Sequence, residues 1–465
     1  MSDFDICVLG GGPGGYAASL YAASAGLKVA LVEKDKIGGT CLHRGCIPAK
    51  GLLQAAEVYR TVGHADAFGF KLPKGETKID WPAVNKRKAG ITNQLHKGLE
   101  GLIKKRKIKI FSGKGTLNAD GKVCVDGKVI SSANVIISSG SVPRLIPGME
   151  LGPRVITSDE ATNCTRERLP KRVAVIGGGV VGVEFASVYT DMGVETTLLE
   201  AMDHAVLPIG PDRDVAAQLE KSLIKRGTRV VAGARVGRLE HKSESVVVPY
   251  EVGGKKSSVE VDQVLVAIGR RAVSEDQGFA EAGIKIDDRG FIDVDTNTMQ
   301  TARANVYAIG DCVNTPGLAH VAYAEAVVAV GSILGENPVP VDYGKVPWVV
   351  YAHPELAWVG MTEEQARAAG LDYEVKVHPW PGNGRSMIVG ETEGMIKVLT
   401  AGGGGPIIGF HLCGPWASEL LTGGYYAVNW EATAADVGHL IHAHPSLSEL
   451  VGESMITFSG RSLHG

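Results

Sequence analysis

The sequence predicts an α/β fold with two dinucleotide-binding units and a C-terminal domain of mixed helices and strands. Three observations support this fold class. The order apolar strand, G-x-G-x-x-G motif, helix and second apolar strand occurs at residues 5–34 and again at 172–201. A stretch rich in Gly and Pro at 335–347 then indicates a linker into a further domain. A length of 465 residues also suggests about three domains.

The composition argues against several classes of protein. Hydrophobic residues make up 44% of the chain and charged residues 21%, which is ordinary for a globular protein. The net charge of −3 gives no overall attraction to nucleic acid or to an anionic membrane. The basic run KKRKIK at 104–109 is more typical of a solvated helix end than of a nucleic-acid or partner site. No apolar run approaches the roughly 18 residues of a membrane span, and the N-terminus shows no targeting signal, so we expect a cytoplasmic protein.

The two βαβ units place their glycines and a final glutamate at matching positions. The set comprises Gly10, Gly12, Gly15 and Glu33 in the first unit, and Gly177, Gly179, Gly182 and Glu200 in the second. In this motif the first glycine permits a tight turn, the second lets the backbone approach a pyrophosphate, and the third lets helix pack on strand. The glutamate then accepts hydrogen bonds from ribose hydroxyls. Two complete units predict two dinucleotide sites, whereas glycine-rich turns that hold no ligand are the alternative.

Glu200 also indicates which coenzyme the second unit binds. A carboxylate at the ribose repels a 2′-phosphate, and the segment EAMDHAV at 200–206 supplies no arginine cluster to hold one. We therefore expect NAD rather than NADP. Two dinucleotide sites in one electron-transferring chain suggest FAD together with NAD, although the glycines alone do not tell which unit binds which.

Other segments extend this framework. We expect helices at 82–107 and 318–335, a hairpin over 122–130 that turns at Asp126–Gly127, and strands at 134–140, 245–252, 261–270 and 305–311. Asp311 ends the last of these strands. Ligands bind at the carboxyl ends of strands in open α/β sheets, so Asp311 is a cofactor candidate, and a turn or helix-capping aspartate is the alternative.

The segment GGTCLHRGCIPAK at 38–50 places Cys41 and Cys46 five residues apart. In a regular helix such residues lie about 7.5 Å apart along the axis, beyond the roughly 4.4 to 6.8 Å of disulfide-linked Cα atoms. A disulfide here therefore requires a distorted turn, which Gly45 and Pro48 favour. Two separate core thiols and half of a zinc site are the alternatives, although cysteines 7, 124, 164, 312 and 413 are isolated and offer no second pair.

This cysteine segment, the two glycine motifs, AIGRR at 267–271, AIGD at 308–311 and HAHPSLSE at 442–449 together resemble the disulfide-reductase flavoproteins. These are the class I pyridine nucleotide-disulfide oxidoreductases, and within them the likeness is greatest to the dihydrolipoamide dehydrogenase family. The likeness extends over nearly the whole chain.

The resemblance implies a role for each matching residue. Cys41 would be the thiol that meets substrate and Cys46 the thiol that faces the flavin. Lys50 would lie near the flavin and pair with Glu184, and His444 with Glu449 would form the acid/base pair. For the cofactors, Gly10, Gly12, Gly15 and Glu33 would hold the ADP part of FAD, Asp311 its ribityl chain, and Gly269 and Arg270 would belong to the cofactor site.

Spacing alone leaves other readings of the C-terminal histidines open. Ser446 and Glu449 match the capping box S-x-x-E, so Glu449 could satisfy a helix N-terminus instead of orienting an imidazole. His439, His442 and His444 could also suggest a metal cluster, but Pro445 interrupts a helical register, and we expect no metal.

The resemblance also implies a domain order and an activity. An FAD-binding domain would comprise 1–148 and 270–340, an NAD-binding domain 149–269, and an α+β dimerisation domain 341–465. The chain would form a homodimer in which the other subunit contributes His444 and Glu449. It would oxidise dihydrolipoyl groups with NAD⁺, free or carried by lipoyl-bearing proteins, as the E3 component of 2-oxoacid dehydrogenase or glycine cleavage complexes.

Two other functions remain as alternatives. One is a related reductase acting on another small thiol such as glutathione or mycothiol, and the other is a non-catalytic FAD-binding assembly subunit. The chain also departs from the commonest family pattern at His43, Arg44, Ala49 and Ser446. We expect Arg44 to lower the pKa of the thiolates by adding a cation beside the disulfide. The bulky helix between Trp416 and Trp430 is a further departure, at the lipoyl channel or the dimer surface.

Overall fold

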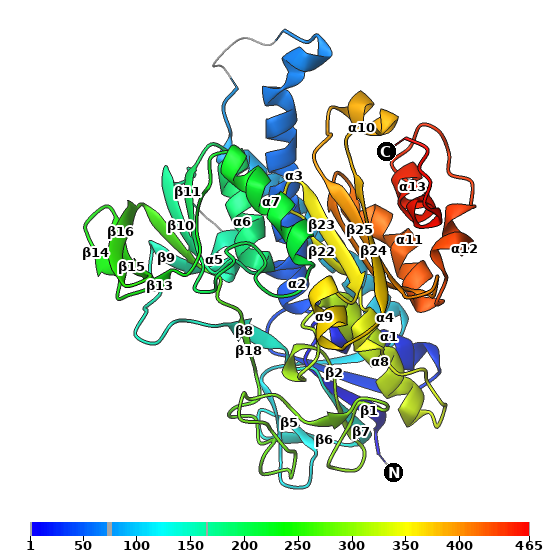
Figure 1. The fold of residues 1–465 in the computed structure, drawn as a ribbon. Coiled ribbons are helices and arrows are strands. Elements are labelled where there is room, and N and C mark those ends of the chain that lie inside the picture. The colour runs from blue at the N-terminus through cyan, green and yellow to red at the C-terminus, as the bar shows by residue number, and fades with distance from the viewer. Residues whose placement is uncertain (1, 72–76, 164–165, 465) are drawn as a thin grey trace.

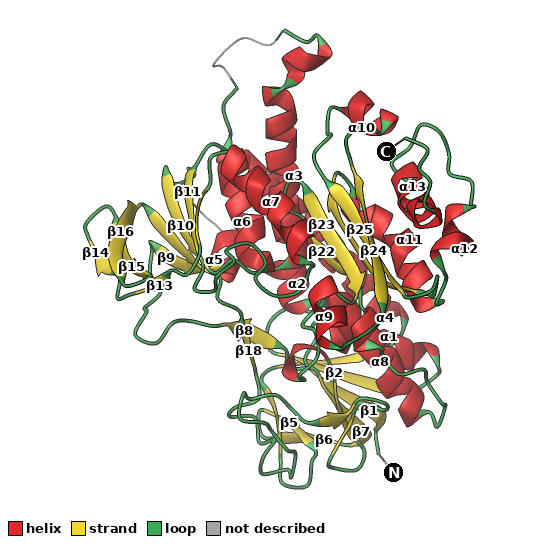
Figure 2. Ribbon diagram, in the orientation of Figure 1, coloured by secondary structure: helices red, strands yellow, loops and turns green. Residues whose placement is uncertain are grey.

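The computed structural model describes residues 2–71, 77–163 and 166–464. Figure 1 shows three groups of elements around the long helix α3 (Cys46–Gly63): β1, β2 and β7 at the bottom, β10 and β11 on the left, and β22 to β25 on the right. Helices cover the sheets in each group (Figure 2). Cys164 lies outside the described residues.

The first sheet has seven strands in the order β19-β20-β21-β7-β1-β2-β3. The strands that pair in parallel are β21, β7, β1, β2 and β3. At the β21 edge, β20 pairs antiparallel with β21, and β19 pairs antiparallel with β20. The bounds are β1 Phe4–Leu9, β2 Val29–Glu33, β3 Lys109–Ser112, β7 Ser132–Ile137, β19 Val294–Asp295, β20 Gln300–Thr301 and β21 Val306–Ala308. Helices α1 (Pro13–Ser24) and α8 (Ala319–Ile333) pack together and, with these strands, form one apolar core.

The second sheet has five parallel strands in the order β12-β11-β10-β17-β9. Their bounds are β9 Val155–Thr157, β10 Arg172–Ile176, β11 Glu195–Leu199, β12 Arg229–Val231 and β17 Gln263–Val266. Helices α5 (Ser158–Thr162), α6 (Val180–Asp191) and α7 (Arg213–Lys225) accompany it. A four-stranded antiparallel sheet of β13 Arg235–Val236, β14 Glu240–His241, β15 Val246–Val252 and β16 Lys255–Val261 lies beside it.

Two strands connect these sheets. β8 (Ser141–Pro143) and β18 (Arg270–Ala272) pair antiparallel where the chain enters and leaves the second sheet. All strands of the second sheet lie between residues 149 and 269, and the first sheet takes β19, β20 and β21 from the chain beyond 270. The exact domain limits remain a prediction.

The C-terminal sheet is antiparallel and has the order β22-β23-β26-β25-β24. The bounds are β22 Trp348–Val350, β23 Glu355–Gly360, β24 Tyr373–Pro379, β25 Met395–Ala401 and β26 Ile407–Gly414. Its helices are α9 Glu363–Ala368, α10 Gly384–Val389, α11 Ala417–Asn429, α12 Ala434–Gly438 and α13 Glu449–Ile456. Helices α11 and α13 share a buried apolar cluster with this sheet.

The remaining elements join the sheets or lie at the surface. The helices are α2 Gly39–His43 and α4 Trp81–Lys105, and a three-stranded meander has β4 Gly115–Leu117, β5 Val123–Val125 and β6 Lys128–Ile130. The short 3₁₀ helices are η1 Ala65–Phe68, η2 Gly310–Cys312, η3 Tyr343–Lys345 and η4 Thr457–Ser459.

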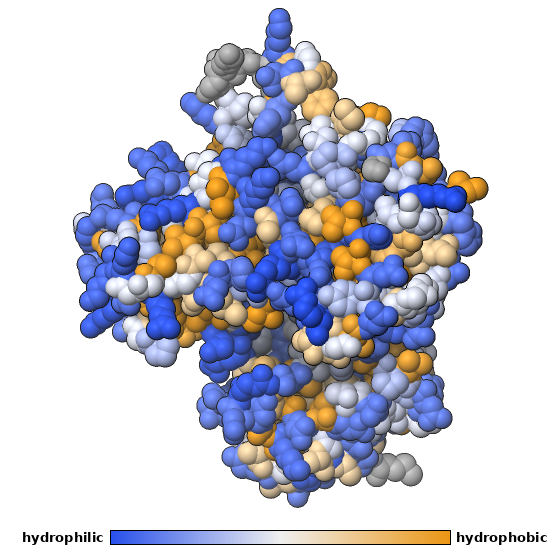
Figure 3. Space-filling view, in the orientation of Figure 1, coloured by the Kyte–Doolittle hydropathy of each residue, from blue (hydrophilic) through white to orange (hydrophobic). Residues whose placement is uncertain are grey.

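Most elements expected from local sequence patterns are confirmed, but the strand expected at 261–270 divides into β17 and β18, and the one expected at 305–311 ends at Ala308. Helix α4 matches the expected helix at 82–107 and α8 that at 318–335, and the hairpin β5–β6 turns at Asp126–Gly127. Asp126 and Gly127 both have positive φ, as a tight hairpin turn requires. Polar and apolar side chains are interspersed on the face drawn in Figure 3. Among the described helices, none combines the length and the apolar character that crossing a membrane would take.

Candidate active site

The two glycine loops are built alike. Gly10 has φ +105° and Gly177 φ +108°, and a Cβ on either would lie 2.2 Å from the carbonyl oxygen of Ser138 or 2.4 Å from that of Ala267. Only glycine fits this turn. The third glycines, Gly15 and Gly182, are equally constrained, because a Cβ there would meet the carbonyl of the first glycine at 1.7 Å and 1.8 Å.

The glutamate of each unit reaches back to its glycine loop. One Glu33 oxygen accepts the N–H of Gly11 at 2.7 Å, and one Glu200 oxygen accepts the N–H of Gly178 at 2.7 Å. The second oxygen of each accepts a backbone N–H two residues further along, at 2.8 Å and 2.9 Å. The two units therefore match in hydrogen bonding as well as in sequence. Contact of either glutamate with a ribose stays a prediction.

The middle glycines point toward open space. A Cβ on Gly12 or on Gly179 would have no other described heavy atom within 4 Å. Each of these residues begins a helix as its N-cap, where backbone N–H groups attract a phosphate. Protein packing does not require glycine at these two positions, whereas the close approach of a pyrophosphate does. The residues present therefore fit dinucleotide cofactors.

A cavity of about 450 Å³ extends from the first glycine loop to the cysteine pair. Its lining includes Gly12, Glu33, Cys41, Cys46 and Asp311. Helix α6, which follows the second glycine motif, reaches the same cavity through Val180, Val181 and Glu184, but none of the glycines of that motif lines it. This arrangement favours the first unit as the FAD site, a question that the glycine spacing leaves open.

Cys41 and Cys46 form a disulfide with a Cα–Cα distance of 4.6 Å. Cys41 lies in the short helix α2, the helical path breaks at Arg44 and Gly45, and Cys46 is the first residue of α3. A Cβ on Gly45 would lie 3.1 Å from the carbonyl oxygen of Thr40, so this break is tight. The distorted turn expected from the spacing is present. The position of Cys46 at a helix N-terminus stabilises a thiolate.

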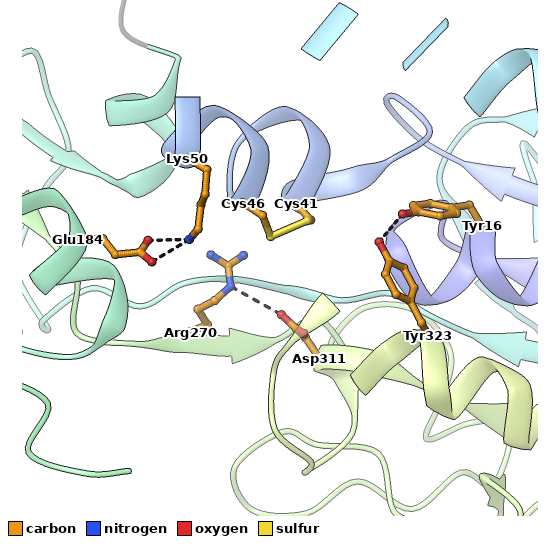
Figure 4. The surroundings of a disulfide bond; sticks show 8 residues. All are labelled: Tyr16, Cys41, Cys46, Lys50, Glu184, Arg270, Asp311 and Tyr323. Atoms are coloured by element: carbon orange, nitrogen blue, oxygen red, sulfur yellow. Dashed lines mark hydrogen bonds and ion pairs between the residues drawn. A yellow bond between two sulfur atoms is a disulfide. The ribbon is translucent and has the colours of Figure 1, made fainter. Parts of the chain in front are cut away.

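Lys50 lies on the first turns of α3 and pairs with Glu184 of α6. Its Nζ is 2.8 Å from both carboxylate oxygens, and the Glu184 side chain is only 5% exposed. Tyr351 completes the group, because its backbone N–H donates to Glu184 at 3.0 Å and its ring centroid lies 4.8 Å from the Lys50 Nζ. Figure 4 shows this ion pair on the Cys46 side of the disulfide.

Asp311 and Arg270 face the disulfide from across the cavity (Figure 4). Asp311 lies in η2, directly after β21, where its carboxylate accepts the Ser141 hydroxyl at 2.5 Å and lies 3.8 Å from the Arg270 Nε. Arg270 also donates from Nε to the Ser141 hydroxyl at 2.6 Å. Gly269, which precedes it, has φ +107°. Asp311 therefore lines the cavity together with the Arg270 cation, which a role in a turn alone would not require.

His444 and Glu449 are brought together in the C-terminal domain. The His444 Nδ1 is 2.8 Å from one Glu449 oxygen, and the other oxygen accepts the Ser446 N–H at 2.7 Å. The Ser446 N–H bond to Glu449 is one half of a capping box, but the Ser446 hydroxyl donates to the Ala443 carbonyl and helix α13 has Ser448 as its N-cap, so the reciprocal half is missing. The carboxylate is partly buried, which favours its neutral form, but the bonds from Ser446 and His444 hold the pKa of Glu449 below its usual range.

His444 itself is open to solvent. Its side chain is 77% exposed, and it is not among the residues that line the cavity around the disulfide of the same chain. The bond at Nδ1 leaves Nε2 available to exchange a proton with another molecule.

The loop between the cysteines holds two of the unusual residues. Arg44 forms an ion pair with Asp35, both side chains being 41% exposed, so its charge is balanced in part. The His43 Nε2 contacts the Ile37 carbonyl at 2.9 Å, and burial lowers the pKa of His43. His96 approaches the same carbonyl at 3.0 Å from α4. Both residues of this loop line the cavity.

Three of the four free cysteines in the described chain are unsuited to exchange, and the fourth, the partly buried Cys124 of β5, does not line the cavity. Burial raises the pKa of Cys7 to about 12 and that of Cys312 to about 11, and it raises that of Cys413 as well. All three are buried and unpaired. A neutral, inaccessible thiol is a poor nucleophile, so the reactive sulfur of this site is confined to Cys41 and Cys46.

Comparison with known proteins identifies this combination of features. Residues 4–326 match the pyridine nucleotide-disulphide oxidoreductase family, and residues 346–455 match the dimerisation domain of that family. The chain belongs to the pyridine nucleotide-disulphide oxidoreductases. The resemblance inferred from the cysteine and glycine motifs is therefore confirmed, and so is the expected fold class.

Curated members of the family resemble the chain over its full length. The dihydrolipoyl dehydrogenase of Thermus scotoductus is 39% identical, with 100% of this chain and 99% of the relative covered. One dihydrolipoyl dehydrogenase of Bacillus subtilis is 36% identical with the same coverage. Among solved structures, LpdA from Mycobacterium tuberculosis superposes with a TM-score of 0.89 at 26% identity, covering 98% of this chain and 99% of that one. The flavoprotein disulfide reductase RclA from Escherichia coli gives 0.86 at 27% identity, with 97% and 99% covered.

Several residues around the disulfide and the cavity escaped sequence reasoning. Tyr351 and Ser141 approach Lys50 and Asp311 only in the folded chain. The Tyr16 and Tyr323 hydroxyls lie 2.5 Å apart on the Cys41 side of the disulfide, and Figure 4 shows both rings there. None of these residues belongs to a local motif, and only spatial proximity reveals them.

Proposed function

We propose that the chain is a dihydrolipoyl dehydrogenase, which oxidises dihydrolipoyl groups to lipoyl groups with NAD⁺ as the acceptor. The observation that carries this proposal is the Cys41–Cys46 disulfide at the end of the cavity that begins at the first glycine loop. Full-length similarity to dihydrolipoyl dehydrogenases supports it. When bound, FAD supplies the transfer of an electron pair from the cysteine pair to NAD⁺.

Gly10, Gly12, Gly15, Glu33 and Asp311 would hold the FAD. The open space at the Cβ position of Gly12, and the cavity that Gly12 lines, support this assignment. In the second unit Gly177, Gly179, Gly182 and Glu200 would hold NAD. The Glu200 carboxylate disfavours a 2′-phosphate, which supports NAD over NADP.

Thiol exchange begins with proton removal. His444 takes the proton of one dihydrolipoyl thiol at Nε2, while Glu449 holds the ring through Nδ1. The thiolate attacks the Cys41 sulfur, the bond to Cys46 breaks, and Cys46 leaves as a thiolate. The second substrate thiol then attacks its neighbouring sulfur and gives its proton to the departing Cys41 sulfur, which releases lipoyl disulfide and leaves Cys41 as a thiol. Two electrons have passed from the substrate to the cysteine pair.

Helix α3 and Lys50 would stabilise the negative charge of the Cys46 thiolate. Cys46 begins α3, where the helix dipole stabilises the thiolate, and Lys50 lies one turn further along the same helix. Glu184 and Tyr351 fix the ammonium group from two sides. Lys50 is therefore in position to balance negative charge that develops in the cavity.

The active unit would be a homodimer. The chain carries the family's dimerisation domain at 346–455, and the exposed His444 lies within it, away from the cavity of its own chain. A second subunit would bring its His444 and Glu449 to Cys41. Three domains would thus meet around one disulfide. They are the FAD domain at 1–148 and 270–340, the NAD domain at 149–269 and the interface domain at 341–465.

The partners would be free dihydrolipoamide and lipoyl-bearing proteins, including those of a 2-oxoacid dehydrogenase complex, in the cytoplasm.

The test is the rate at which the purified, FAD-loaded dimer reduces NAD⁺ with dihydrolipoamide. Parallel assays replace NAD⁺ by NADP⁺, or replace dihydrolipoamide by reduced glutathione or mycothiol. We expect rapid reduction of NAD⁺ by dihydrolipoamide alone. Rapid turnover with another thiol and none with dihydrolipoamide would overturn the proposal.

A further inference from the structure

Asn383 connects helix α10 to the loop that carries His444. Its Nδ2 donates to the carbonyl oxygen of Ser446 at 3.0 Å, across 63 residues of sequence. Its Oδ1 accepts the N–H of Ser386 at 3.0 Å and so caps α10. A donor faces the amide oxygen and an acceptor faces the amide nitrogen, so these two partners fix the orientation of the side chain.

Ser446 is held on both sides of its backbone. Its N–H donates to Glu449, and its carbonyl accepts from Asn383. Its hydroxyl donates to the Ala443 carbonyl at 2.5 Å. The Glu449 carboxylate that anchors Ser446 also contacts His444 through its other oxygen at 2.8 Å. Asn383, Ser446, Glu449 and His444 therefore form one continuous chain of hydrogen bonds.

Packing contributes little to the position of the imidazole. The His444 side chain is 77% exposed, whereas that of Glu449 is 16% exposed. An exposed ring keeps a single orientation only through its hydrogen bonds, and here that bond comes from Glu449. Helix α13 and the apolar core hold the backbone of Glu449, whereas Ser446 holds its carboxylate. Among the side-chain hydrogen bonds of the described residues, the one from Asn383 reaches this network from outside the segment 443–449.

We propose that Asn383 is a positioning residue for proton transfer by His444. The inference rests on the proposed function, in which His444 is the base. Loss of the amide donor leaves the Ser446 carbonyl without its protein partner, so the loop gains other arrangements and His444 meets the substrate thiol less often. The cost of one such hydrogen bond corresponds to a rate loss of about ten-fold.

The variant that isolates this role is Asn383→Asp. Aspartate keeps the oxygen that caps α10 but lacks the amide donor, and Asn383→Ser offers an uncharged cap that is too short to reach Ser446. Asn134→Asp is the matched control, because the Asn134 Nδ2 donates to the Asp5 carbonyl at 3.3 Å in the first sheet, outside the C-terminal domain that carries His444. Thermal unfolding of each holoenzyme checks that the fold is intact.

The measurement compares two activities of each FAD-loaded dimer. Reduction of NAD⁺ by dihydrolipoamide, followed from pH 5.5 to 9, needs His444, whereas oxidation of NADH by ferricyanide does not. In both Asn383 variants we expect the first rate to fall about ten-fold. The ferricyanide rate should stay within about two-fold of the parent, as both rates should in Asn134→Asp.

Two results would overturn the inference, and they can be told apart. If the parent reduces NAD⁺ with dihydrolipoamide and both Asn383 variants keep its rate and pH profile, the positioning role is wrong and the proposed function stands. If both activities fall together in the Asn383 variants, the residue supports the fold only. If the parent itself does not oxidise dihydrolipoamide, the proposed function fails, and the role of Asn383 fails with it.

Discussion

Arg44 lies between the two cysteines, but its charge is not free. Its guanidinium pairs with Asp35, and both side chains are 41% exposed. Exposed ion pairs of this kind stabilise a fold by about 1 kcal/mol or less, and solvent screens their field. Arg44 also lines the cavity beside Cys41 and Cys46. The sequence suggested an added cation beside the disulfide, and the structure shows that Asp35 balances this cation in part.

Substitution of Arg44 should still shift thiol reactivity, by a limited amount. In reduced Arg44→Ala the pH midpoint for alkylation of the cysteine pair should rise by less than about one unit, because a cation that favours the thiolate has been removed. Asp35→Ala should move the midpoint in the opposite direction, since it frees the guanidinium. Alkylation with iodoacetamide across pH 5 to 9 measures both. An unmoved midpoint in Arg44→Ala would show that this residue does not influence the thiols.

At the scale of elements, local patterns predict the βαβ units well. The glycine loops need glycine for reasons that lie within 35 residues of sequence, namely the positive φ at Gly10 and Gly177 and the close helix packing at Gly15 and Gly182. The S-x-x-E spacing indicates the bond between Ser446 and Glu449, but no local pattern predicts that Asn383 reaches Ser446. That contact depends on how distant segments pack, and no residue spacing encodes it.

The middle glycines allow the two cofactor sites to be separated by mutation. Both have extended backbone and open space at the Cβ position, so Gly12→Ala and Gly179→Ala should fold normally. We expect Gly12→Ala to lose FAD affinity by ten-fold or more, because the methyl group occupies the approach of the pyrophosphate. Gly179→Ala should keep its flavin and raise the KM for NAD⁺ instead.

Flavin absorbance after dialysis and steady-state kinetics measure the two effects. Gly15→Ala serves as the contrast, since its Cβ would meet the Gly10 carbonyl at 1.7 Å and the variant should not fold. Flavin loss in Gly179→Ala and retention in Gly12→Ala would reverse the assignment of the two units.

Across the whole molecule, an ion cluster around the buried pair Lys397 and Asp212 joins the second sheet's domain to the C-terminal sheet. Lys397 of β25 is 3% exposed and contacts Asp212 at 2.9 Å, Asp214 at 2.7 Å and Glu363 at 2.7 Å. Asp212, at the start of α7, is 2% exposed. Burial favours its neutral form, but the bonds from Lys397 and from the Glu363 backbone hold the pKa of Asp212 below its usual range. The bond from Lys397 likewise lowers the pKa of Glu363.

Loss of Lys397 should destabilise the protein in a pH-dependent way. Lys397→Met leaves the Asp212 carboxylate buried without its cation, which costs roughly 3–5 kcal/mol at pH 7. A carboxylate with a depressed folded-state pKa stabilises the fold above its unfolded pKa of about 4, and that stabilisation is lost as pH falls through the folded pKa. The difference in Tm between parent and variant should therefore be largest above about pH 5 and shrink below about pH 4. An equal difference at pH 7 and pH 3.5 would contradict the electrostatic account.

The central claim is that electrons leave the substrate through Cys41 and Cys46. The most direct test is an anaerobic titration of the FAD-loaded dimer with dihydrolipoamide, quenched with an alkylating agent and mapped by peptide mass, with NADH formation followed after NAD⁺ is added. We predict that dihydrolipoamide makes Cys41 and Cys46 alkylatable, that NAD⁺ restores their protection as NADH appears, and that Cys46→Ser forms no NADH. NADH formation from dihydrolipoamide in Cys46→Ser at the parent rate would contradict the account.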